Sequence, residues 1–430
     1  MMRASSRRQV GLFRRCAASA GAAALALGGL AGCGGTSGDA TAGAPGVTED
    51  TILLGSTQAL SGPAAPYAAI GKAMTAYFDY LNEHGGVHGR SIELKIADDA
   101  YNPSNTASQT RKLVLQDNVF AMAASLGTPT VSAVSDFLTQ NKVPNLFPTS
   151  GSRVWNQPDK HPAAFGFSPN YTIEGKVLGT YISEKFPDKT VCFFGQADDF
   201  GADGLAGLEK VVKVAQKQEY SPANTDIAPQ IGALKSAGCQ VTVSFTTAGF
   251  SALTLGTAAR QDFKTQWVFT GSGFDIPTLE GFLKEDTIEL TEGAITSAYL
   301  PVSTAADNSW IKLFKEINQD YNGNARFDFN TVYGMSVAYT VAQALERAGE
   351  DLTRDSLVDA VAKGGIRGPM LTPFQYSEDN HSGASGTQVY VARAGVLEPA
   401  SPIYTTDDGD GDVVESTTPP AEAPQDGLPQ

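Results

Sequence analysis

Short apolar runs alternate with longer amphipathic stretches along most of the chain. The run TILLG at 51–55 predicts a buried strand, apolar residues recur at helical spacing over 70–81, and residues 92–96 alternate as in a second strand. The pair Gly85-Gly86 ends the predicted helix. The first predicted elements are therefore a strand, a helix and a strand.

The same cycle continues toward the C-terminal end. Thr128 and Pro129 suit the start of a helix, as an N-cap hydroxyl followed by proline at the first helical position. Strands that alternate with helices predict an α/β fold, in which helices cover parallel sheets. The pattern predicts helices over 103–116, 128–141, 170–186, 201–217, 250–260 and 277–284, and strands at 119–123, 144–147, 165–167, 191–195, 239–245 and 267–271.

Residues 1–32 have the layout of a lipoprotein signal peptide. Arginines without any acidic residue precede an apolar stretch at 17–30, which is too short and too rich in glycine to span a membrane. The residues SRRQV at 6–10 resemble part of a twin-arginine export signal, and a general secretory signal explains them equally well. The sequence thus predicts export by one of these two routes.

A cysteine follows this stretch directly. Leu30-Ala31-Gly32-Cys33 resembles the lipobox of bacterial lipoproteins, in which small residues precede a cysteine that is acylated and becomes the new N-terminus. We therefore expect a protein anchored through lipid at Cys33 to the extracytoplasmic face of the cell membrane. The alternative is an ordinary cleavage site with an incidental cysteine.

Both ends of the remaining chain lack the composition of a core. Residues 33–46 are rich in small residues and predict a flexible tether, and the acidic, proline-rich residues 405–430 predict a disordered tail. The stretch DDGDGD at 407–412 lacks the glycine and the closing glutamate of a calcium loop, so we expect solvated acids there. The intervening body, roughly 350 residues, is long enough for two domains.

Charge and cysteine content narrow the class of protein further. The formal net charge is −15, and removal of the arginine-containing leader makes the body more acidic still, which argues against a nucleic-acid partner. Cys192 and Cys239 remain in strand-like runs of the body. Neighbouring strands would allow a disulfide, but we expect two buried free thiols.

The common catalytic and metal-binding motifs are absent from the sequence. It contains no G-x-S-x-G elbow, no P-loop, no H-E-x-x-H and no paired C-x-x-C motif. His84 and His88 flank Gly85-Gly86, which breaks the helix that would align them as metal ligands. We therefore predict that the protein is not an enzyme and binds no cofactor and no metal.

Several short segments, taken in order, resemble one known family. Over residues 47–400 the chain is similar to the leucine/isoleucine/valine-binding type of extracytoplasmic solute-binding protein, which serves ABC importers and has the type I periplasmic binding protein fold. The segments that carry the resemblance are Ser61-Gly62-Pro63, residues 81–90, Asp98-Asp99, Asn102-Pro103, residues 199–204 and Tyr333-Gly334.

The resemblance implies two Rossmann-like lobes joined by a three-crossing hinge. Lobe 1 would comprise residues 47–166 plus 299–374, and lobe 2 would comprise residues 167–298 plus 375–404. A small-molecule ligand would lie between them, at the carboxyl ends of the strands. Hinge closure around it would give the form that an ABC permease and its ATPase subunits recognise. We expect the protein to be a monomer.

The resemblance also implies positions for the ligand. Thr128 falls where the family uses a hydroxyl for a ligand carboxylate, and Thr149 falls where it uses the backbone. The family's second ligand threonine corresponds to Gly151, which Ser150 and Ser152 flank. These hydroxyls are the first candidate site residues.

Other candidate positions depart from the family pattern. Phe200 replaces a cleft tyrosine, and the acid that meets a ligand ammonium falls near Gly273, two residues before Asp275. These departures favour a carboxylate-bearing or neutral polar solute with an apolar part. The remaining candidates are the hydroxyl of Ser125, the rings of Tyr67 and Tyr171 that would close over a ligand, and the rings of Phe250 and Phe274 as cleft walls. Each has a structural alternative: core packing for phenylalanines, a helix surface for tyrosines and a helix cap for Thr128 and Asp275.

Three functions are compatible with these features. The predicted one is a lipid-anchored protein that captures a small polar solute, such as an amino acid, an amide or a carboxylate, for an ABC importer. The alternatives are a ligand-sensing receptor subunit of the same fold and an exported hydrolase on an α/β scaffold.

Overall fold

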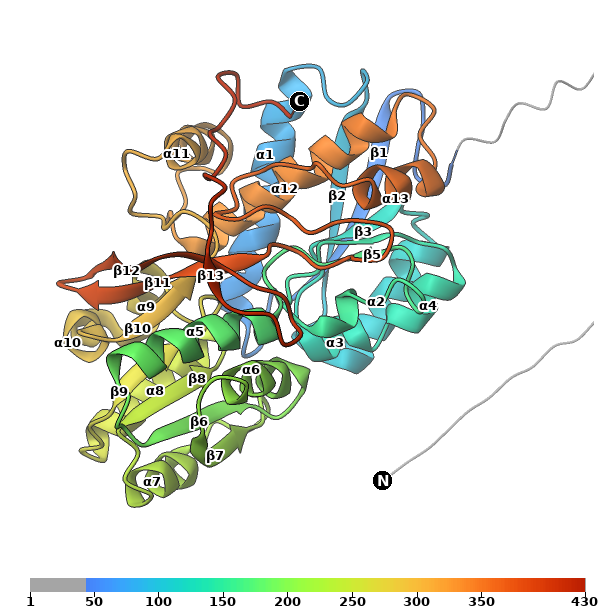
Figure 1. The fold of residues 1–430 in the computed structure, drawn as a ribbon. Helices are drawn as coiled ribbons and strands as arrows, with labels where there is room; N and C mark the ends of the chain where they lie inside the picture. The colour runs from blue at the N-terminus through green and yellow to red at the C-terminus, as the bar shows by residue number, and fades with distance from the viewer. Residues whose placement is uncertain (1–43, 430) are drawn as a thin grey trace, which may run out of the picture. The chain divides into compact units, whose positions relative to one another are not determined.

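Two β-sheets organise residues 44–429, which are the residues that the computed structural model of the chain describes (Figure 1). The first sheet has five parallel strands in the order β2-β1-β3-β4-β5. The second has eight strands in the order β13-β12-β11-β10-β9-β8-β6-β7, of which β6 to β10 are parallel and β11 to β13 antiparallel. The predicted α/β fold is confirmed, with a parallel first sheet and a second sheet that is parallel only in part.

The strands of the first sheet are β1 (Thr51–Gln58), β2 (Ser91–Asp98), β3 (Ala121–Ala123), β4 (Asn145–Leu146) and β5 (Ala164–Phe165). Those of the second are β6 (Val191–Gln196), β7 (Val214–Tyr220), β8 (Val241–Phe245), β9 (Gln266–Phe269), β10 (Ile295–Ala298), β11 (Gly386–Arg393), β12 (Val396–Thr405) and β13 (Val414–Glu415).

Helices of both halves of the sequence cover the first sheet, because α1 packs against α11 and α12, which follow β10 in the chain. The helices beside the first sheet are α1 (Ala68–Glu83), α2 (Pro103–Leu115), α3 (Thr128–Ser132), α4 (Ser135–Gln140), α11 (Ser309–Tyr321), α12 (Phe329–Ala348) and α13 (Arg354–Ala362). Those beside the second are α5 (Tyr171–Lys185), α6 (Asp199–Glu209), α7 (Ala228–Ser236), α8 (Ala248–Arg260), α9 (Ile276–Leu283) and α10 (Thr287–Thr291). No helix within residues 44–429 is long and apolar enough to cross a membrane.

The inner strands of the second sheet are buried on both faces, whereas β7, β12 and β13 are partly or fully exposed. Phe193 and Phe194 are adjacent in β6 but pack into different hydrophobic clusters, because successive side chains of a strand point to opposite faces. Val268 and Phe269 of β9 divide in the same way. This explains why these strands are continuous apolar runs in the sequence.

The chain passes between the two sheets three times, after β5, after β10 and before β11, which confirms the predicted hinge. We name the part built on the first sheet the first lobe and the part built on the second sheet the second lobe. The predicted signal peptide, the predicted acylation site Cys33 and most of the tether lie outside the described residues.

Two predicted helices differ from the structure. The helix expected over 201–217 ends at Glu209, and β7 follows as an edge strand in which half-buried and exposed residues alternate. The helix expected over 128–141 is two short helices, α3 and α4. Thr128 is the first residue of α3 instead of its N-cap, a position held by Gly127 with a φ of 100°.

The two cysteines of the body form a disulfide, so the expectation of two free thiols is wrong. Cys192 lies in β6, and Cys239 lies two residues before β8, its parallel neighbour. This pairing brings the two Cα atoms to 5.7 Å, within the range that a disulfide spans. The bond fastens β6 to the segment that leads into β8.

The predicted disordered tail is also wrong, because residues 405–429 pack on both lobes. Strand β13 pairs with β12 of the second lobe, and residues 416–429, which we name the C-terminal strap, return to the first lobe (Figure 1). The indole N–H of Trp310 donates to the Ala421 carbonyl at 2.7 Å, and the Tyr77 hydroxyl donates to the Gly427 carbonyl at 2.9 Å. The amino-acid composition did not predict this order, because the strap is held mainly through its backbone carbonyls.

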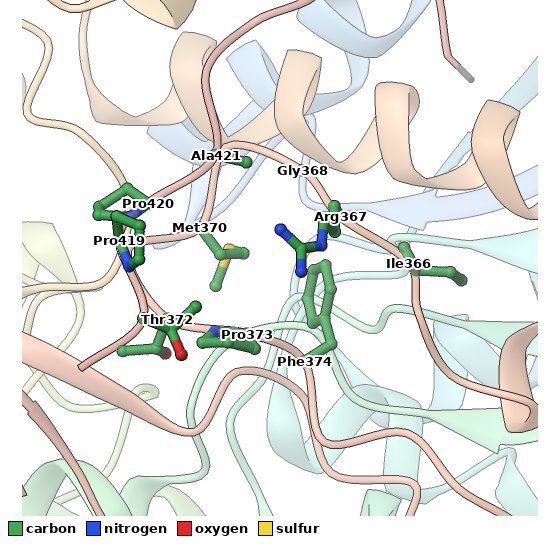
Figure 2. A pocket seen from close by; sticks show the side chains of 11 residues that line it. Ile366, Arg367, Gly368, Met370, Thr372, Pro373, Phe374, Pro419, Pro420 and Ala421 are labelled. Atoms are coloured by element: carbon green, nitrogen blue, oxygen red, sulfur yellow. The ribbon is translucent and has the colours of Figure 1, made fainter. Parts of the chain in front are cut away.

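A small hollow of about 30 Å³ separates part of the strap from the third crossing of the chain. Figure 2 shows Pro419, Pro420 and Ala421 of the strap opposite Met370 and Thr372 of that crossing. The strap therefore runs beside the hinge and forms a fourth connection between the lobes.

The acidic loop before β13 binds a lysine of its own chain. Lys176 of α5 is only 3% exposed, and its ammonium donates to the carbonyls of Asp407, Gly409 and Gly411 at 3.0, 3.1 and 2.6 Å. It also contacts a carboxylate oxygen of Asp407 at 3.1 Å. Backbone carbonyls of this loop thus surround an ammonium group, whereas the Asp410 carboxylate is 97% exposed, as expected for a solvated acid.

Candidate functional site

Two adjoining cavities lie between the lobes, with volumes of about 20 and about 40 Å³. They share Tyr67, Thr149, Tyr171 and Ser272, so we treat them as one site, the interlobe cavity. Most of the lining residues follow the carboxyl ends of strands in both sheets, where open α/β sheets bind ligands, and the others lie on α1, α5 and α12. The lining residues are Tyr67, Ile70, Tyr101, Leu126, Gly127, Thr128, Thr149, Ser150, Gly151, Ser168, Pro169, Tyr171, Glu174, Phe200, Thr247, Ser272, Tyr299, Phe329 and Tyr333.

The structure brings some of the predicted site residues together at this cavity and places others elsewhere. Those that line it are Tyr67, Thr128, Thr149, Ser150, Tyr171 and Phe200. Those that do not line it are Ser125, Ser152, Phe250, Phe274 and Asp275. Direct contact of the first group with a ligand stays a prediction.

A cluster of hydroxyls occupies the first-lobe side of the cavity. The Thr128 and Ser150 hydroxyls lie 2.7 Å apart, and the Ser150 oxygen accepts from the Ser152 backbone N–H at 3.2 Å. The Thr149 hydroxyl donates to the Ala124 carbonyl at 3.1 Å, and Ser125 accepts from the Thr57 N–H at 3.2 Å. Ser125 is thus tied to the sheet, whereas Thr128 and Ser150 face the cavity.

Aromatic rings form the opposite wall and join the lobes. The Tyr67 hydroxyl donates to the Ser272 carbonyl and accepts from the Ala248 N–H, both at 2.9 Å, and both partners belong to the second lobe. Burial raises the pKa of Tyr67 to about 12, so the phenol stays protonated at neutral pH. The Tyr171 ring lies 4.6 Å from the Phe200 ring, centroid to centroid. The cavity is therefore closed by direct contacts across the two lobes.

A second contact between the lobes involves Asp203 of α6. Its carboxylate accepts from the Arg153 side chain and backbone N–H, both at 3.0 Å, and from the Ser152 hydroxyl at 3.2 Å. Ser152 therefore takes part in joining the lobes and does not reach the cavity.

The remaining predicted residues belong to the second-lobe core or its helix ends. Phe250 stacks on Tyr220 with ring centroids 4.1 Å apart, and Phe274 stacks on Phe269 at 4.9 Å. Both phenylalanines therefore pack in the core, which was the structural alternative to their predicted role as cleft walls.

Asp275 caps α9, which was the structural alternative to its predicted role as a ligand partner. Its carboxylate accepts from the Thr278 N–H at 3.0 Å and from the Phe329 N–H of the first lobe at 3.3 Å. Burial, with a smaller contribution from the Asp328 carboxylate, raises the pKa of Asp275 to about 6. The acid thus stabilises a helix end and a contact between lobes.

Sequence reasoning missed the acidic residue of the cavity. Glu174 lies in α5, is 3% exposed and lines the cavity together with Tyr299 and Tyr333. Burial raises the pKa of its carboxyl above the usual range, although three hydrogen-bond donors oppose this shift. The sequence signal for Glu174 is an acidic residue within the stretch YTIEGKVLG, which belongs to a predicted helix. Every residue from Tyr171 to Gly179 is buried, so this acid is buried too.

Comparisons with known proteins agree with this architecture. A sequence profile of the family described as periplasmic binding protein matches residues 51–396. The chain is 26% identical over 203 residues to the Leu/Ile/Val-binding protein homolog 3 of Brucella melitensis, and the match covers 44% of this chain and 53% of that protein. It is 25% identical over 198 residues to the leucine-, isoleucine-, valine-, threonine- and alanine-binding protein of Pseudomonas aeruginosa, with 44% and 52% covered. The chain thus spans about half the length of the curated relatives it matches.

Solved structures show the same fold over a longer span. A branched-chain amino acid ABC transporter protein from Thermus thermophilus with bound valine superimposes with a TM-score of 0.75 at 20% identity, covering 84% of this chain and 98% of that one. A fatty acid ABC transporter substrate-binding protein from Thermomonospora curvata gives 0.73 at 23% identity, with 85% and 95% covered. The two-lobe architecture and the profile match lead to one conclusion: the chain belongs to the periplasmic binding protein family.

Proposed function

We propose that this protein captures a small polar solute with an apolar part between its two lobes and delivers it to an ABC importer. The observation that carries the proposal is the interlobe cavity, which hydroxyls and aromatic rings of both lobes enclose. The relatives described as leucine-, isoleucine- and valine-binding proteins support the same class of solute.

Closure of the lobes supplies the mechanism of capture. The Thr128 and Ser150 hydroxyls can donate to a carboxylate or amide of the solute, and the Tyr171 and Phe200 rings can enclose its apolar part. Separation of the lobes would break the contacts of Tyr67 with the second lobe, and a bound solute that touches both lobes favours the closed state. A permease and its ATPase subunits would recognise the closed form.

A thermal-shift screen tests this function. A ligand that binds only the folded protein raises its melting temperature, so we expect a shift with one class among amino acids, amides, aromatic acids and short carboxylates.

Thr128→Ala should weaken binding of a carboxylate-bearing hit by about 1.5–3 kcal/mol, the scale of a hydrogen bond to a charged group. Thr180→Ala, which removes a part-buried hydroxyl of α5 outside the cavity, is the matched control. Equal affinities of the two variants would remove Thr128 from the site.

The proposal includes a lipid anchor at Cys33. Two acyl chains hold a soluble protein firmly at a bilayer, whereas one chain binds only marginally. Cys33→Ser should therefore move the protein from the membrane fraction to the soluble fraction of the cell envelope, as measured by immunoblotting. Retention of the serine variant in the membrane fraction would contradict the anchor assignment.

A further inference from the structure

Two acidic helix caps, one from each lobe, lie close together where the lobes meet. Asp275 precedes α9 of the second lobe, and Asp328 precedes α12 of the first lobe. The Phe329 backbone N–H, next to Asp328, donates to the Asp275 carboxylate at 3.3 Å. The exposed fractions of Asp275 and Asp328 are 7% and 6%. Contact between the lobes thus brings two carboxyl groups together away from water.

The hydrogen bonds of Asp275 leave one of its carboxyl oxygens available for a proton. The Thr278 N–H and hydroxyl donate to Oδ2 at 3.0 and 2.8 Å, and the Phe329 N–H donates to the same oxygen. None of these three donors uses Oδ1. A proton on Oδ1 therefore leaves both the cap of α9 and the contact between the lobes in place.

The charges around this pair do not neutralise it. Neither Asp275 nor Asp328 belongs to an ion pair within residues 44–429. Arg326 lowers the pKa of Asp328 only weakly, because its guanidinium donates to the Pro277 carbonyl and, at 2.9 Å, to the Glu280 carboxylate. The other charged residues of elements packed against α9 are exposed or lie at the far ends of their helices: Arg260, residues 284–286, Glu289, Glu346 and Arg347.

The two acids make contact between the lobes sensitive to pH. Burial raises the pKa of Asp275 to about 6, the Asp328 carboxylate adds to this shift, and burial also raises the pKa of Asp328. Separation of the lobes would return water to both groups, and a solvated aspartate has a pKa of about 3.9. The closed form therefore binds a proton more tightly than the open form. This contribution to its stability is complete below about pH 4 and is lost as the pH rises through about 6.

We propose that closure of the two lobes takes up a proton at the pair of Asp275 and Asp328, so that acid favours the closed form. This inference goes beyond the proposed function, because it concerns the lobes with or without a solute. Where the lobes do hold a solute, the same pair makes capture tighter in acid and release easier at neutral pH.

Single-molecule FRET on the ligand-free full chain tests this proposal. The dyes are attached through non-native amino acids in place of Lys235 of α7 and Asp355 of α13, which are exposed, so the disulfide stays intact. From about pH 7.5 to about pH 5, the ratio of closed to open molecules should rise several-fold, up to about tenfold. Asp275→Asn should remove most of this rise, because an amide caps a helix but does not titrate. Asp262→Asn, at a carboxylate that is 82% exposed, should preserve it.

A ratio that stays constant or falls on acidification would overturn the proposal, as would a wild-type pH response in Asp275→Asn. If Asp275→Asn does not fold, Asp328→Asn replaces it. Removal of the like charge should move the midpoint of the response to lower pH, and an unchanged midpoint contradicts the role of the pair. Absence of the pH response would leave solute capture standing. Failure of every compound in the thermal-shift screen would remove the proposed function and leave proton uptake on closure intact.

Discussion

Reduction of the disulfide between Cys192 and Cys239 is expected to lower the free energy of unfolding by about 4 kcal/mol. The bond closes a loop with a sequence separation of 47, and a cross-link of this span removes a large part of the unfolded chain's conformational freedom. Both cysteines are buried in the second-lobe core, so their substitution also disturbs packing. Urea unfolding with and without a reducing agent measures the loss.

The double variant Cys192→Ala, Cys239→Ala is the control for this experiment. It should unfold at the lower urea concentration whether or not reductant is present, because it has no bond to reduce. Coincident curves for the oxidised and reduced wild-type protein would contradict the prediction. The proposed ligand should still bind the reduced protein, since neither cysteine lines the interlobe cavity.

Deletion of residues 416–430 is expected to cost about 3 kcal/mol of stability. The deletion removes the carbonyl partners of Trp310, Tyr77 and Tyr80, and a typical hydrogen bond contributes about 1 kcal/mol. It also uncovers apolar surface of the first lobe on which Ala423 and Leu428 pack. Denaturant unfolding measures the loss, and a red shift of tryptophan fluorescence reports the exposure of Trp310, which is 1% exposed in the full chain.

A double-mutant cycle separates the hydrogen bond of the strap from its other contacts. Trp310→Phe should destabilise the full chain more than the truncated chain, because the indole N–H has its carbonyl partner only in the former. Lys210→Ala is a contrasting control, since its partner Asp410 is 97% exposed and such pairs contribute little. Equal free energies of unfolding for the full and truncated chains would show that the strap does not stabilise the protein.

Elements with strong local signals could be predicted from the sequence. Helix α2 begins at Pro103 after an Asn102 cap, and α5 begins at Tyr171 after an Asn170 cap, each within one residue of the predicted start. Strand β7 was missed because its residues, VAQKQEY, are mostly polar and only half-buried at the sheet edge. The C-terminal strap was missed for a related reason, since backbone carbonyls leave no trace in composition.

Some residues of the site could also be predicted from the sequence, and others could not. Thr128, Thr149 and Ser150 follow strand ends of the first sheet, so topology alone predicts that they meet. Glu174 and Tyr333 lie on helices, where only the packing of the lobes decides which side faces the cavity. Phe250 and Phe274 were predicted as cleft walls because they follow strand ends, but both rings turn into the core of the second lobe.

Residues 416–429 leave the ribosome after every strand and helix of both lobes. Trp310 and Tyr77 find their carbonyl partners in this segment, so the nascent first lobe cannot complete its hydrogen bonding until residues 416–429 have been synthesised. A premature stop codon there would spare every lining residue of the cavity and still release a weakened protein from the cell's synthesis machinery.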